Sequence, residues 1–379
     1  METKTVRLGD VANVNPRLPL TKGTVARKIP MEALTAHQRH IDSFFYEKYS
    51  GGVKFQNGDT LVARITPSLE NGKTAYVDLL DKDEIAFGST EFIVLRAKNK
   101  LILPKFLYYI SISDDFRQMA IQSMTGTSGR QRVQSESVIN YEFSLPDIEK
   151  QTAIVDLLDA IDQKLKINQQ INKNLLRLAK QQFNLTFPNV HEGNSRLSNV
   201  MENFDRKRIP LARREREKRQ GVYRYVGATS VLDYVDDYLF DGTYLLMGED
   251  GTVQDEKGFP ILQYIWGKFW PNNHTHVLSG TFVSTEWLYL FLMNTNVRSR
   301  ITGAVQQKIS QANMNSIPLT IPSKDELFRF QKQIEPVFSQ IQLLDEQNLK
   351  LTAIHKLLLP KLLAGQIDLS NLEGAIQNA

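Results

Sequence analysis

The fold is decided by residues 147–187, which read DIEKQTAIVDLLDAIDQKLKINQQINKNLLRLAKQQFNLTF and contain neither Gly nor Pro. Apolar side chains recur in a heptad frame at Leu158, Ile161, Leu165 and Leu175, with polar residues on either side. Sustained spacing of this kind is typical of a long helix in a coiled coil. Taken alone, the stretch leaves one alternative open, an amphipathic helix packed on its own domain.

A second copy at 323–363 favours the coiled coil. The copies align without a gap at an offset of 176 residues, so that Pro146 matches Pro322 and Leu165 matches Ile341. Weaker matches extend upstream of both stretches. The chain is therefore a tandem duplication of a globular segment and its helix, with a period far longer than that of solenoid repeats.

The duplication also predicts how the two helices pair. Copies related by a pseudo-twofold axis pack antiparallel, and a positions then face d positions across the seam. The best apolar match has facing residue numbers that sum to 516, as for Leu165 with Leu351. The same register places Asn168 opposite Asn348, and a buried Asn is a known device for fixing register.

The two globular segments alternate short apolar runs with turn signals, which predicts compact mixed sheets. The fold class expected is α+β, with two mixed α/β domains that are each followed by a long helix of an antiparallel coiled coil. The predicted strands are 60–63, 74–77 and 92–95, then 222–226, 244–247 and 261–264, and the predicted shorter helices are 104–122 and one beginning at Trp287.

Composition is ordinary for a globular protein: 379 residues, 41% hydrophobic and 23% charged. The net charge of +4 is small, so an anionic partner has to be held by local patches. The absence of Cys excludes disulfides and thiolate metal sites. No apolar run reaches the length of a membrane span, and residues 1–4 lack the apolar core of a signal peptide. A cytoplasmic location is expected.

The search for catalytic motifs returns negatives. GxGxxG, P-loop and HExxH spacings are absent, and so is the Asn-Pro-Pro-Tyr element with which base-methylating enzymes hold a flipped base. Asp147 and Glu149 lack the spacing of a nuclease signature and are better explained as charges that complement a helix dipole. His274 and His276 can share one face of a strand, but no third ligand is evident, so no metal site is predicted.

The positive signals point to nucleic acid. Residues 206–219 hold eight basic and two acidic side chains, a net charge of +6. Phosphate contact, with some arginines reaching guanine edges, competes with the alternative of a solvated helix face. Glycine-bearing polar loops at 126–132 and 303–308 occupy the same place in both halves. An ordinary polar turn explains one such loop, but its recurrence favours function.

At this point the chain resembles the specificity subunit of type I DNA restriction-modification systems, over essentially its whole length. The Leu145–Gln151 segment and its counterpart at 321–322 lead into long helices, and other stretches are similar to two classes of target-recognition domain. These stretches are 59–73 and 88–92 in the first half, and 225–229, 236–242, 248–251 and 272–278 in the second. The second helix departs from the first by carrying Pro336 and Pro360, which predicts kinks.

The resemblance implies a non-catalytic subunit with five consecutive segments. These are target-recognition domain 1 at 1–146, a spacer helix at 147–187 that binds modification subunits, target-recognition domain 2 at 188–322, a distal helix at 323–366 and a tail at 367–379. Each domain would read half of a split target in double-stranded DNA. Two modification subunits would carry S-adenosylmethionine and methylate adenine, this chain would hold no cofactor, and restriction subunits are further partners that the resemblance allows.

The candidate DNA-binding residues are chosen for hydrogen-bonding or cationic side chains within these motifs, loops and the basic stretch. For the first half-site they are Arg64, Thr66, Lys73, Ser89, Thr90, Arg130, Gln131 and Arg132. For the second half-site they are Arg213, Arg214, Arg216, Lys218, Thr229, Asn273, His274, Gln306, Gln307 and Lys308. Gly88, Asp250 and Gly251 are interpreted as residues that hold turns.

Two other classes of function stay open. One is a self-sufficient methyltransferase or nuclease, against which the missing methylation motif argues. The other is a coiled-coil scaffold with no DNA role. Salt-dependent gel shifts separate the scaffold from a DNA-binding protein, because phosphate contacts weaken steeply as salt is raised.

Overall fold

The computed structural model describes residues 4–98, 101–127, 129–303 and 306–367. The chain divides into two compact units, one formed by 1–167 with 348–379 and the other by 168–347. This division differs from consecutive domains and helices, because each unit contains part of both long helices. The predicted tail at 367–379 lies outside the described residues apart from Ile367. Among the described helices, none is long and apolar enough to cross a membrane.

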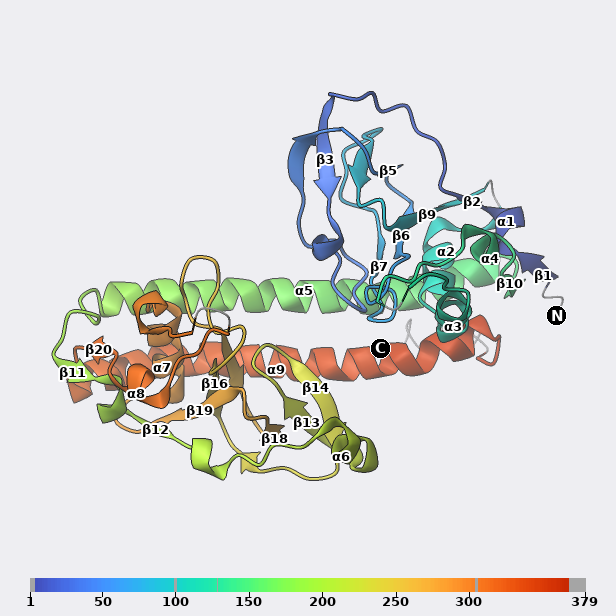
Figure 1. The fold of residues 1–379 in the computed structure, drawn as a ribbon. Coiled ribbons are helices and arrows are strands. Elements are labelled where there is room, and N and C mark those ends of the chain that lie inside the picture. Colours follow the sequence, from blue (N-terminus) through green and yellow to red (C-terminus); the bar gives the residue numbers. More distant parts are fainter. Residues whose placement is uncertain (1–3, 99–100, 128, 304–305, 368–379) are drawn as a thin grey trace, which may run out of the picture. The chain divides into compact units, whose positions relative to one another are not determined.

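The two long helices are α5, Ile148–Thr186, and α9, Lys324–Leu363 (Figure 1). Both begin with a side-chain cap after a proline. Asp147 Oδ1 accepts a hydrogen bond from the backbone N–H of Lys150 at 2.9 Å, and Ser323 and Glu326 form a reciprocal capping box. The backbone hydrogen bond from Lys150 lowers the pKa of Asp147 more than any other contact does, which agrees with an acidic group at a helix start.

Within each unit, α5 and α9 pair in the predicted register to within one residue. In the second unit Asn168 Nδ2 donates to Gln347 Oε1 at 2.8 Å, and Gln182 Nε2 donates to Gln333 Oε1 at 3.0 Å. Both pairs of residue numbers sum to 515, beside the predicted 516. In the first unit His355 Nε2 lies 3.6 Å from Asp162 Oδ1, a pair whose numbers sum to 517, and Leu158 and Leu358 belong to one apolar cluster.

The first unit has three sheets, two of them four-stranded. β1, Lys4–Arg7, pairs antiparallel with β10, Glu142–Leu145. The first four-stranded sheet has the order β2-β9-β6-β7 and the second has the order β4-β3-β8-β5, with β3 and β8 parallel. The other strands are β2, Ala12–Val14; β3, Val25–Ile29; β4, Phe45–Lys48; β5, Val53–Phe55; β6, Thr60–Ala63; β7, Thr74–Tyr76; β8, Ala86–Gly88; and β9, Phe92–Ala97.

The second unit repeats this topology strand for strand. β11, Ser195–Arg196, pairs with β20, Pro318–Leu319, and the four-stranded orders are β12-β19-β16-β17 and β14-β13-β18-β15, with β13 and β18 parallel. The duplication inferred from sequence is therefore a duplication of fold. The other strands are β12, Met201–Asn203; β13, Gln220–Val226; β14, Val231–Val235; β15, Phe240–Asp241; β16, Tyr244–Gly248; β17, Leu262–Ile265; β18, Lys268–Pro271; and β19, Thr275–Gly280.

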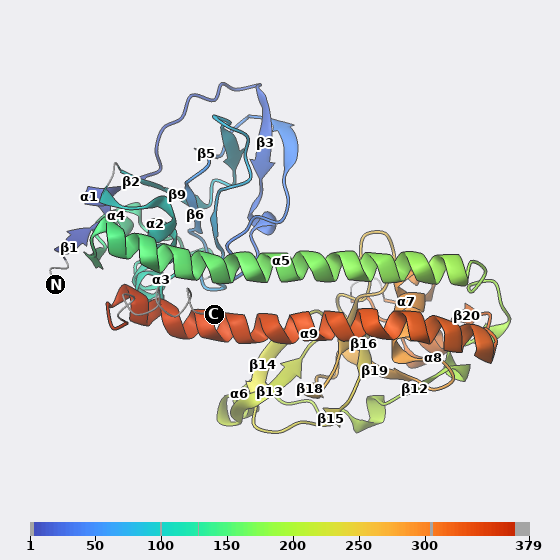
Figure 2. The same ribbon diagram turned by 180° about the vertical axis from the view of Figure 1, so that it is seen from behind.

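Short helices complete each unit, and α2 in the first unit and α7 in the second pack on the first four-stranded sheet. Figure 2 shows α7 and α8 beside α9 in the second unit. The first unit has α1, Leu8–Val11; η1, Met31–Ala33; α2, Pro104–Ser111; α3, Asp114–Gln122; and α4, Ser135–Ile139. The second unit has η3, Leu197–Asn199; η4, Asp205–Lys207; α6, Arg213–Lys218; α7, Thr285–Met293; η5, Arg298–Arg300; and α8, Gln311–Asn315.

The largest core of each unit is completed by the long helices. In the first unit, Phe106 of α2 and Leu158 of α5 are fully buried in the same cluster as Leu359 of α9. In the second, Trp287 of α7 packs edge-on against Phe183 of α5 with ring centroids 5.3 Å apart. The long helices thus complete a core that α2 in the first unit and α7 in the second begin on the sheet.

The predicted fold class is confirmed, but several element bounds are wrong. The helix predicted over 104–122 is two helices, because Ser113 accepts a hydrogen bond from Phe116 N at 3.2 Å and starts a new helix. The helix predicted to begin at Trp287 begins at Thr285, after the Ser284 cap. The second sheet of the first unit was not anticipated, because its strands are short and lack clear alternation.

Both prolines of α9 lie inside a helix whose assignment is unbroken from Lys324 to Leu363. Proline removes one helical hydrogen bond and crowds the preceding turn. We expect Pro336→Ala to stabilise the second unit by about 1–3 kcal/mol, since Pro336 is exposed and makes no core contact that alanine would lose. Urea unfolding of the full chain measures this, with exposed Glu335→Ala as the control near zero. A lowered midpoint would mean that Pro336 fixes a helix shape that the packing needs.

Candidate DNA interface

In the first unit a polar loop is fastened to the ends of the central strands. Arg64, just after β6, donates its backbone N–H to Glu91 O at 2.9 Å, and Val133 N donates to Arg64 O at 2.8 Å. Thr66 N donates to Gln131 O at 3.0 Å. Three candidate segments that are distant in sequence, 64–66, 89–91 and 130–133, therefore meet at one end of the sheet.

The second unit builds the same frame from different residues. Glu249 N donates to His274 O, Gly251 N donates to Gln307 O, and Ile309 N donates to Glu249 O, each at 2.9 Å. We call this place the sheet-end site, formed by 64–66, 89–91 and 130–133 in the first unit and by 249–251, 272–274 and 306–309 in the second. The same backbone hydrogen bonds, called here the backbone frame, occur in both units, whereas the side chains at the site differ between them.

In the first unit the sheet-end site is organised by one ion pair. The Arg132 guanidinium grips the Glu91 carboxylate with two parallel bonds, Nε to Oε2 at 2.9 Å and Nη2 to Oε1 at 2.6 Å. This bidentate hydrogen bond lowers the pKa of Glu91 and raises the pKa of Arg132. The Arg132 side chain remains 43% exposed, so part of the guanidinium faces solvent.

The other candidates of the first half fall into two groups. Ser89 Oγ accepts from Glu91 N at 3.1 Å and Thr66 Oγ1 donates to Gln131 O at 3.3 Å, so both hydroxyls support the frame. Lys73 Nζ donates to Met31 O at 3.0 Å, and its ammonium is directed to η1. Thr90 and Arg130 are exposed beside the Arg132–Glu91 pair.

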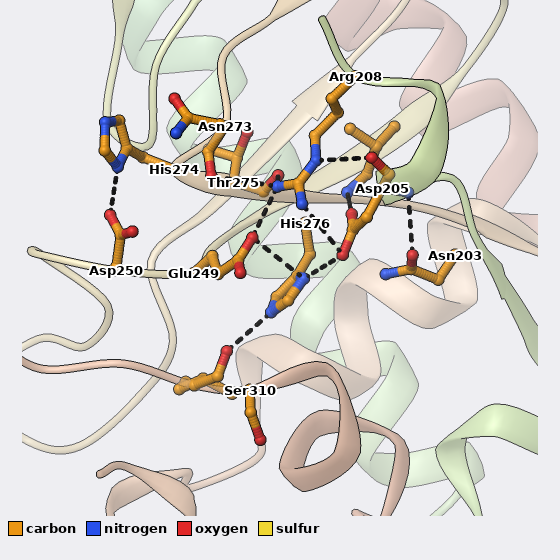
Figure 3. Close-up of polar contacts among 12 residues, drawn as sticks. Asn203, Asp205, Arg208, Glu249, Asp250, Asn273, His274, Thr275, His276 and Ser310 are labelled. Carbon is orange, nitrogen blue, oxygen red and sulfur yellow. Dashed lines mark hydrogen bonds and ion pairs between the residues drawn. The ribbon is translucent and has the colours of Figure 1, made fainter. Parts of the chain in front are cut away.

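In the second unit, charged residues lie beneath the sheet-end site (Figure 3). Fully buried His276 places Nδ1 2.6 Å from Asp205 Oδ2 and Nε2 2.8 Å from Ile309 O. Both neighbouring atoms are acceptors, so the imidazole is held between the Asp205 carboxylate and a backbone carbonyl. Arg208 Nη1 donates to Glu249 Oε2 at 2.7 Å and completes a cluster of one histidine, one arginine and two carboxylates.

The contacts of Arg208 with the carboxylates of this cluster argue against a metal centre there. Ligand atoms of Asp205, Glu249 and His276 lie within 4.8 Å of one another. Arg208, however, contacts both carboxylates, since its Nη2 is also 3.6 Å from Asp205 Oδ2. Burial alone raises the pKa of Asp205, but hydrogen bonding and charge from His276 outweigh it and hold the pKa below the ordinary value. The carboxylates are thus neutralised by protein cations.

Two predicted residues lie directly above this cluster. His274 Nδ1 contacts Asp250 Oδ1, and Figure 3 shows His274 turned away from His276, so the two do not share a site. Lys308 Nζ is 3.3 Å from Glu249 Oε1 and its side chain is 49% exposed. Gln307 Oε1 accepts from Gln254 Nε2 at 3.4 Å, and Gln306 is exposed.

The basic stretch 206–219 separates into fastened and exposed cations. Arg216 is fastened: its Nε meets Asp233 Oδ2 at 3.2 Å, Nη1 donates to Leu211 O at 2.8 Å and the guanidinium lies over the Tyr225 ring. Arg216 thus anchors α6 to the sheet, and its side chain is less exposed than that of Arg132. The exposed cations of the stretch include Arg213, Arg214 and Lys218.

The remaining candidates, Thr229 and Asn273, are exposed loop residues; Asn273 also accepts a hydrogen bond from Arg208 at its backbone oxygen. Sequence reasoning did not assign Glu91 and Glu249 to the sites, and it interpreted Asp250 as a turn residue. The Gly-Glu-Asp-Gly run at 248–251 was a usable signal, because a carboxylate beside a polar basic loop is a ready partner for its cation.

Comparison with known proteins matches the family model described as "Type I restriction modification DNA specificity domain" twice, at residues 1–177 and 192–353. The chain belongs to this type I specificity family. The HindI specificity subunit of Haemophilus influenzae is 32% identical over 135 residues, 35% of this chain and 28% of that protein. The EcoAI specificity subunit of Escherichia coli is 28% identical over 212 residues, 52% of this chain and 35% of that protein.

These matches span about a third of the relatives' own length. Among solved structures, the type I S subunit from M. genitalium is similar at a TM-score of 0.51, with 16% identity over 95% of this chain and 96% of that one. The HsdS subunit from Thermoanaerobacter tengcongensis has a TM-score of 0.40 at 17% identity, over 96% and 97% of the two chains. The likeness to the M. genitalium subunit shows the shared fold.

The buried cluster generates a pH-dependent prediction for this specificity chain. Asp205→Asn should destabilise the second unit by about 2–4 kcal/mol at pH 7, because His276 and Arg208 lose a carboxylate partner in a buried site. The lowered pKa of Asp205 means that its contribution is complete above the ordinary carboxyl range and is lost as pH falls through that range. The difference between wild type and variant, measured by urea unfolding, should therefore shrink toward pH 3.

The matched control is Asp236→Asn, which removes the half-exposed partner of Arg219. It should change stability by less than about 1 kcal/mol at any pH. An Asp205→Asn effect no larger than that of Asp236→Asn would contradict the role of Asp205 as the buried partner of His276 and Arg208.

Proposed function

We propose that this chain is the non-catalytic DNA-recognition subunit of a type I restriction-modification complex, acting in the cytoplasm. Each unit reads one half of a bipartite target in double-stranded DNA. The chain holds two modification subunits, which carry S-adenosylmethionine and methylate adenine, and it binds no cofactor itself. Restriction subunits are additional partners of the same assembly.

The repeated sheet-end site carries this proposal. One backbone frame presents Arg132 and Glu91 in the first unit and Lys308, His274 and Glu249 in the second. A constant scaffold with exchanged hydrogen-bonding groups suits two readers of different base sequences, because base edges differ in their pattern of donors and acceptors. A purely structural duplication would have no reason to exchange the exposed polar groups and retain the frame.

Exposed cations in each unit supply the contacts to phosphates. In the first unit Arg130 is exposed beside the Arg132–Glu91 pair. In the second unit Arg213, Arg214 and Lys218 are exposed on α6. Such contacts position a protein on the duplex and make its affinity salt-dependent. They also separate this proposal from a coiled-coil scaffold, whose DNA affinity would be negligible at low salt.

A self-sufficient enzyme is the other rival. The conspicuous cluster of carboxylates and imidazole in the second unit is occupied by Arg208, which leaves those groups no role in proton transfer or metal binding. Titration of the isolated chain with S-adenosylmethionine tests the rival directly, since a methyltransferase must bind the methyl donor. Saturable binding to the isolated chain would favour the enzyme.

The outer faces of the long helices support docking of partner subunits. On α5 within the second unit, Ile171, Leu178 and Leu185 recur every seven residues and are 38%, 55% and 79% exposed. On α9 within the first unit, Ile354 and Leu357 are 45% and 59% exposed. Leu178 and Ile354 are equivalent at the repeat offset of 176, whereas the residues equivalent to Ile171 and Leu185 are Gln347 and Lys361. One matched, exposed apolar position in the stripe of each unit suits two copies of one partner.

The two-reader proposal predicts that specificity is separable by half. Replacing residues 195–322 with the corresponding segment of a relative exchanges the sheet-end site of the second unit and leaves that of the first intact. Methylation mapping in cells that carry the chimaera and its modification subunit should show one half of the target changed and the other retained. A chimaera that alters both halves, or methylates without a bipartite target, would sink the proposal.

The stripes predict the stoichiometry of assembly. Leu178→Asp should remove one modification subunit per chain, Ile354→Asp the other, and the double variant both, because a carboxylate cannot be buried without a partner. Sedimentation velocity with purified subunits reads the mass of each complex. Asn184→Asp is the matched control, since it adds the same charge to an exposed position about 120° around α5 from Leu178. Unchanged mass in all three stripe variants would place the docking surface elsewhere.

A further inference from the structure

We propose that Arg132 reads a guanine in the first half-site, and that Glu91 is the positioning residue that holds its guanidinium for this contact. The inference rests on the proposed DNA-recognition function and deepens it by naming the reader and its base. It is carried by the geometry of the Arg132–Glu91 pair, by the exposure of Arg132 and by the contrast with other arginines of the chain.

The N–H donors of the Arg132 guanidinium are only partly used within the protein. A guanidinium has five N–H groups in a planar fork. Glu91 uses Nε and one N–H of Nη2, which form the side edge of the fork. Nη1 meets the backbone oxygen of Arg130 at 3.4 Å, and no other protein acceptor for it lies within the described residues. The end edge of the fork, between Nη1 and Nη2, therefore keeps two donors for a ligand.

The Arg132 side chain is also open to solvent. The Arg132 side chain is 43% exposed, whereas Arg216, which was also considered a reader, is 17% exposed and is fastened by a carboxylate, a carbonyl and an aromatic ring. Arg216 thus shows what a structural arginine looks like in this protein. Arg132 differs because its partner takes one edge and leaves the other toward solvent.

Both members of the Arg132–Glu91 pair are held in place by their neighbours. Glu91 is itself held at both ends of its backbone, since its N–H donates to Ser89 Oγ at 3.1 Å and its carbonyl accepts from Arg64 N at 2.9 Å. Arg132 is fastened by antiparallel bridges to Ile65 and to Thr125. A long side chain fixed from both sides loses little rotamer freedom when it binds, which favours a specific contact.

The donors on the open edge of Arg132 identify the base that it can bind. In the major groove, guanine presents two acceptors, O6 and N7, side by side, and the end edge of a guanidinium matches both. Adenine and cytosine place an amino donor there, and thymine offers one carbonyl oxygen beside a methyl group. The open edge of Arg132 contains donors alone, so guanine is the base that it pairs with twice.

The second unit provides an internal contrast at the same place. Lys308 occupies the position of Arg132 in the frame, and its ammonium faces Glu249. An ammonium is a point charge without a fork, so the second unit does not repeat the bidentate contact. Arg132 should therefore affect the first half-site alone, and the two positions can serve as controls for each other.

The test uses the full chain assembled with its modification subunits, on a duplex whose target has been defined by methylation mapping. Each guanine of the target is replaced in turn by 7-deazaguanine, which pairs normally but lacks the N7 acceptor. Competition binding measures the loss of affinity. In the wild-type complex, one guanine of one half-site should show a loss of about 5- to 100-fold, the range of a good bidentate contact.

In the Arg132→Ala complex the loss at that guanine should vanish, while the losses at other guanines persist. Arg132→Lys keeps the charge and a donor for N7 but removes the fork, so it should reduce the loss at that guanine without abolishing it and should bind more strongly overall than alanine. Glu91→Gln should reduce discrimination at the same guanine, because one carboxylate contact and the charge are lost. Lys308→Ala should leave this guanine's effect intact, and Arg130→Ala should weaken binding to all sequences alike.

The outcomes separate this inference from the proposed function. Absence of sequence-specific binding by the wild-type complex would refute the function itself. Specific binding with a guanine profile that Arg132→Ala and Arg132→Lys leave unchanged would refute the role of Arg132 alone. A target whose half-sites contain no guanine would do the same. The lysine variant and the Arg130→Ala variant also control for folding, since both must retain salt-dependent DNA binding.

Discussion

The structure depends on burial of the long helices inside the cores of the domains that they connect. In the first unit Leu158 of α5 and Leu359 of α9 share a core with Phe106, and in the second Phe183 and Phe330 share one with Trp287. A four-stranded sheet with one apolar face needs a cover, and here α2 or α7 supplies it together with the helix pair. The helices are therefore part of each domain's hydrophobic core as well as connectors between segments.

That constraint leaves the ends of the sheets free to vary. The hydrogen bonds that fasten 131–133 and 307–309 to the strand ends involve backbone atoms, so side chains can be exchanged without loss of the frame. The first unit uses an arginine gripped by a glutamate at the strand end, and the second uses a lysine, a histidine and two carboxylates over a buried, charge-balanced cluster. This separation of scaffold from reader is what a protein with two different half-sites requires.

Sequence reasoning succeeded where the signal was periodic or repeated. The heptads, the duplication and the strands around Thr60–Ala63 follow from apolar spacing and turn residues, and the helix register follows from matching the two copies. It failed where tertiary contacts decide. Nothing local distinguishes Arg216, fastened on Asp233 and Tyr225, from exposed Arg214, and Glu91 is 41 residues from the arginine that it positions. Arg64 and Glu249 occupy equivalent places in the two backbone frames. The number of residues between equivalent positions differs between the strand ends and the loop, so a gapless alignment of the two copies does not pair them.

The division of the core has a consequence for biosynthesis. The second unit is one continuous segment, 168–347, so all of its core residues have been made once the ribosome has passed α9's middle. The first unit includes residues from 348 onward, and Leu358, Leu359 and Leu362 join a core whose strands were made more than 200 residues earlier. The domain that is translated first is thus the last to complete its core, although α2 already packs on its first four-stranded sheet. Chains cut short in α9 would contain a finished second unit and an open, aggregation-prone first one.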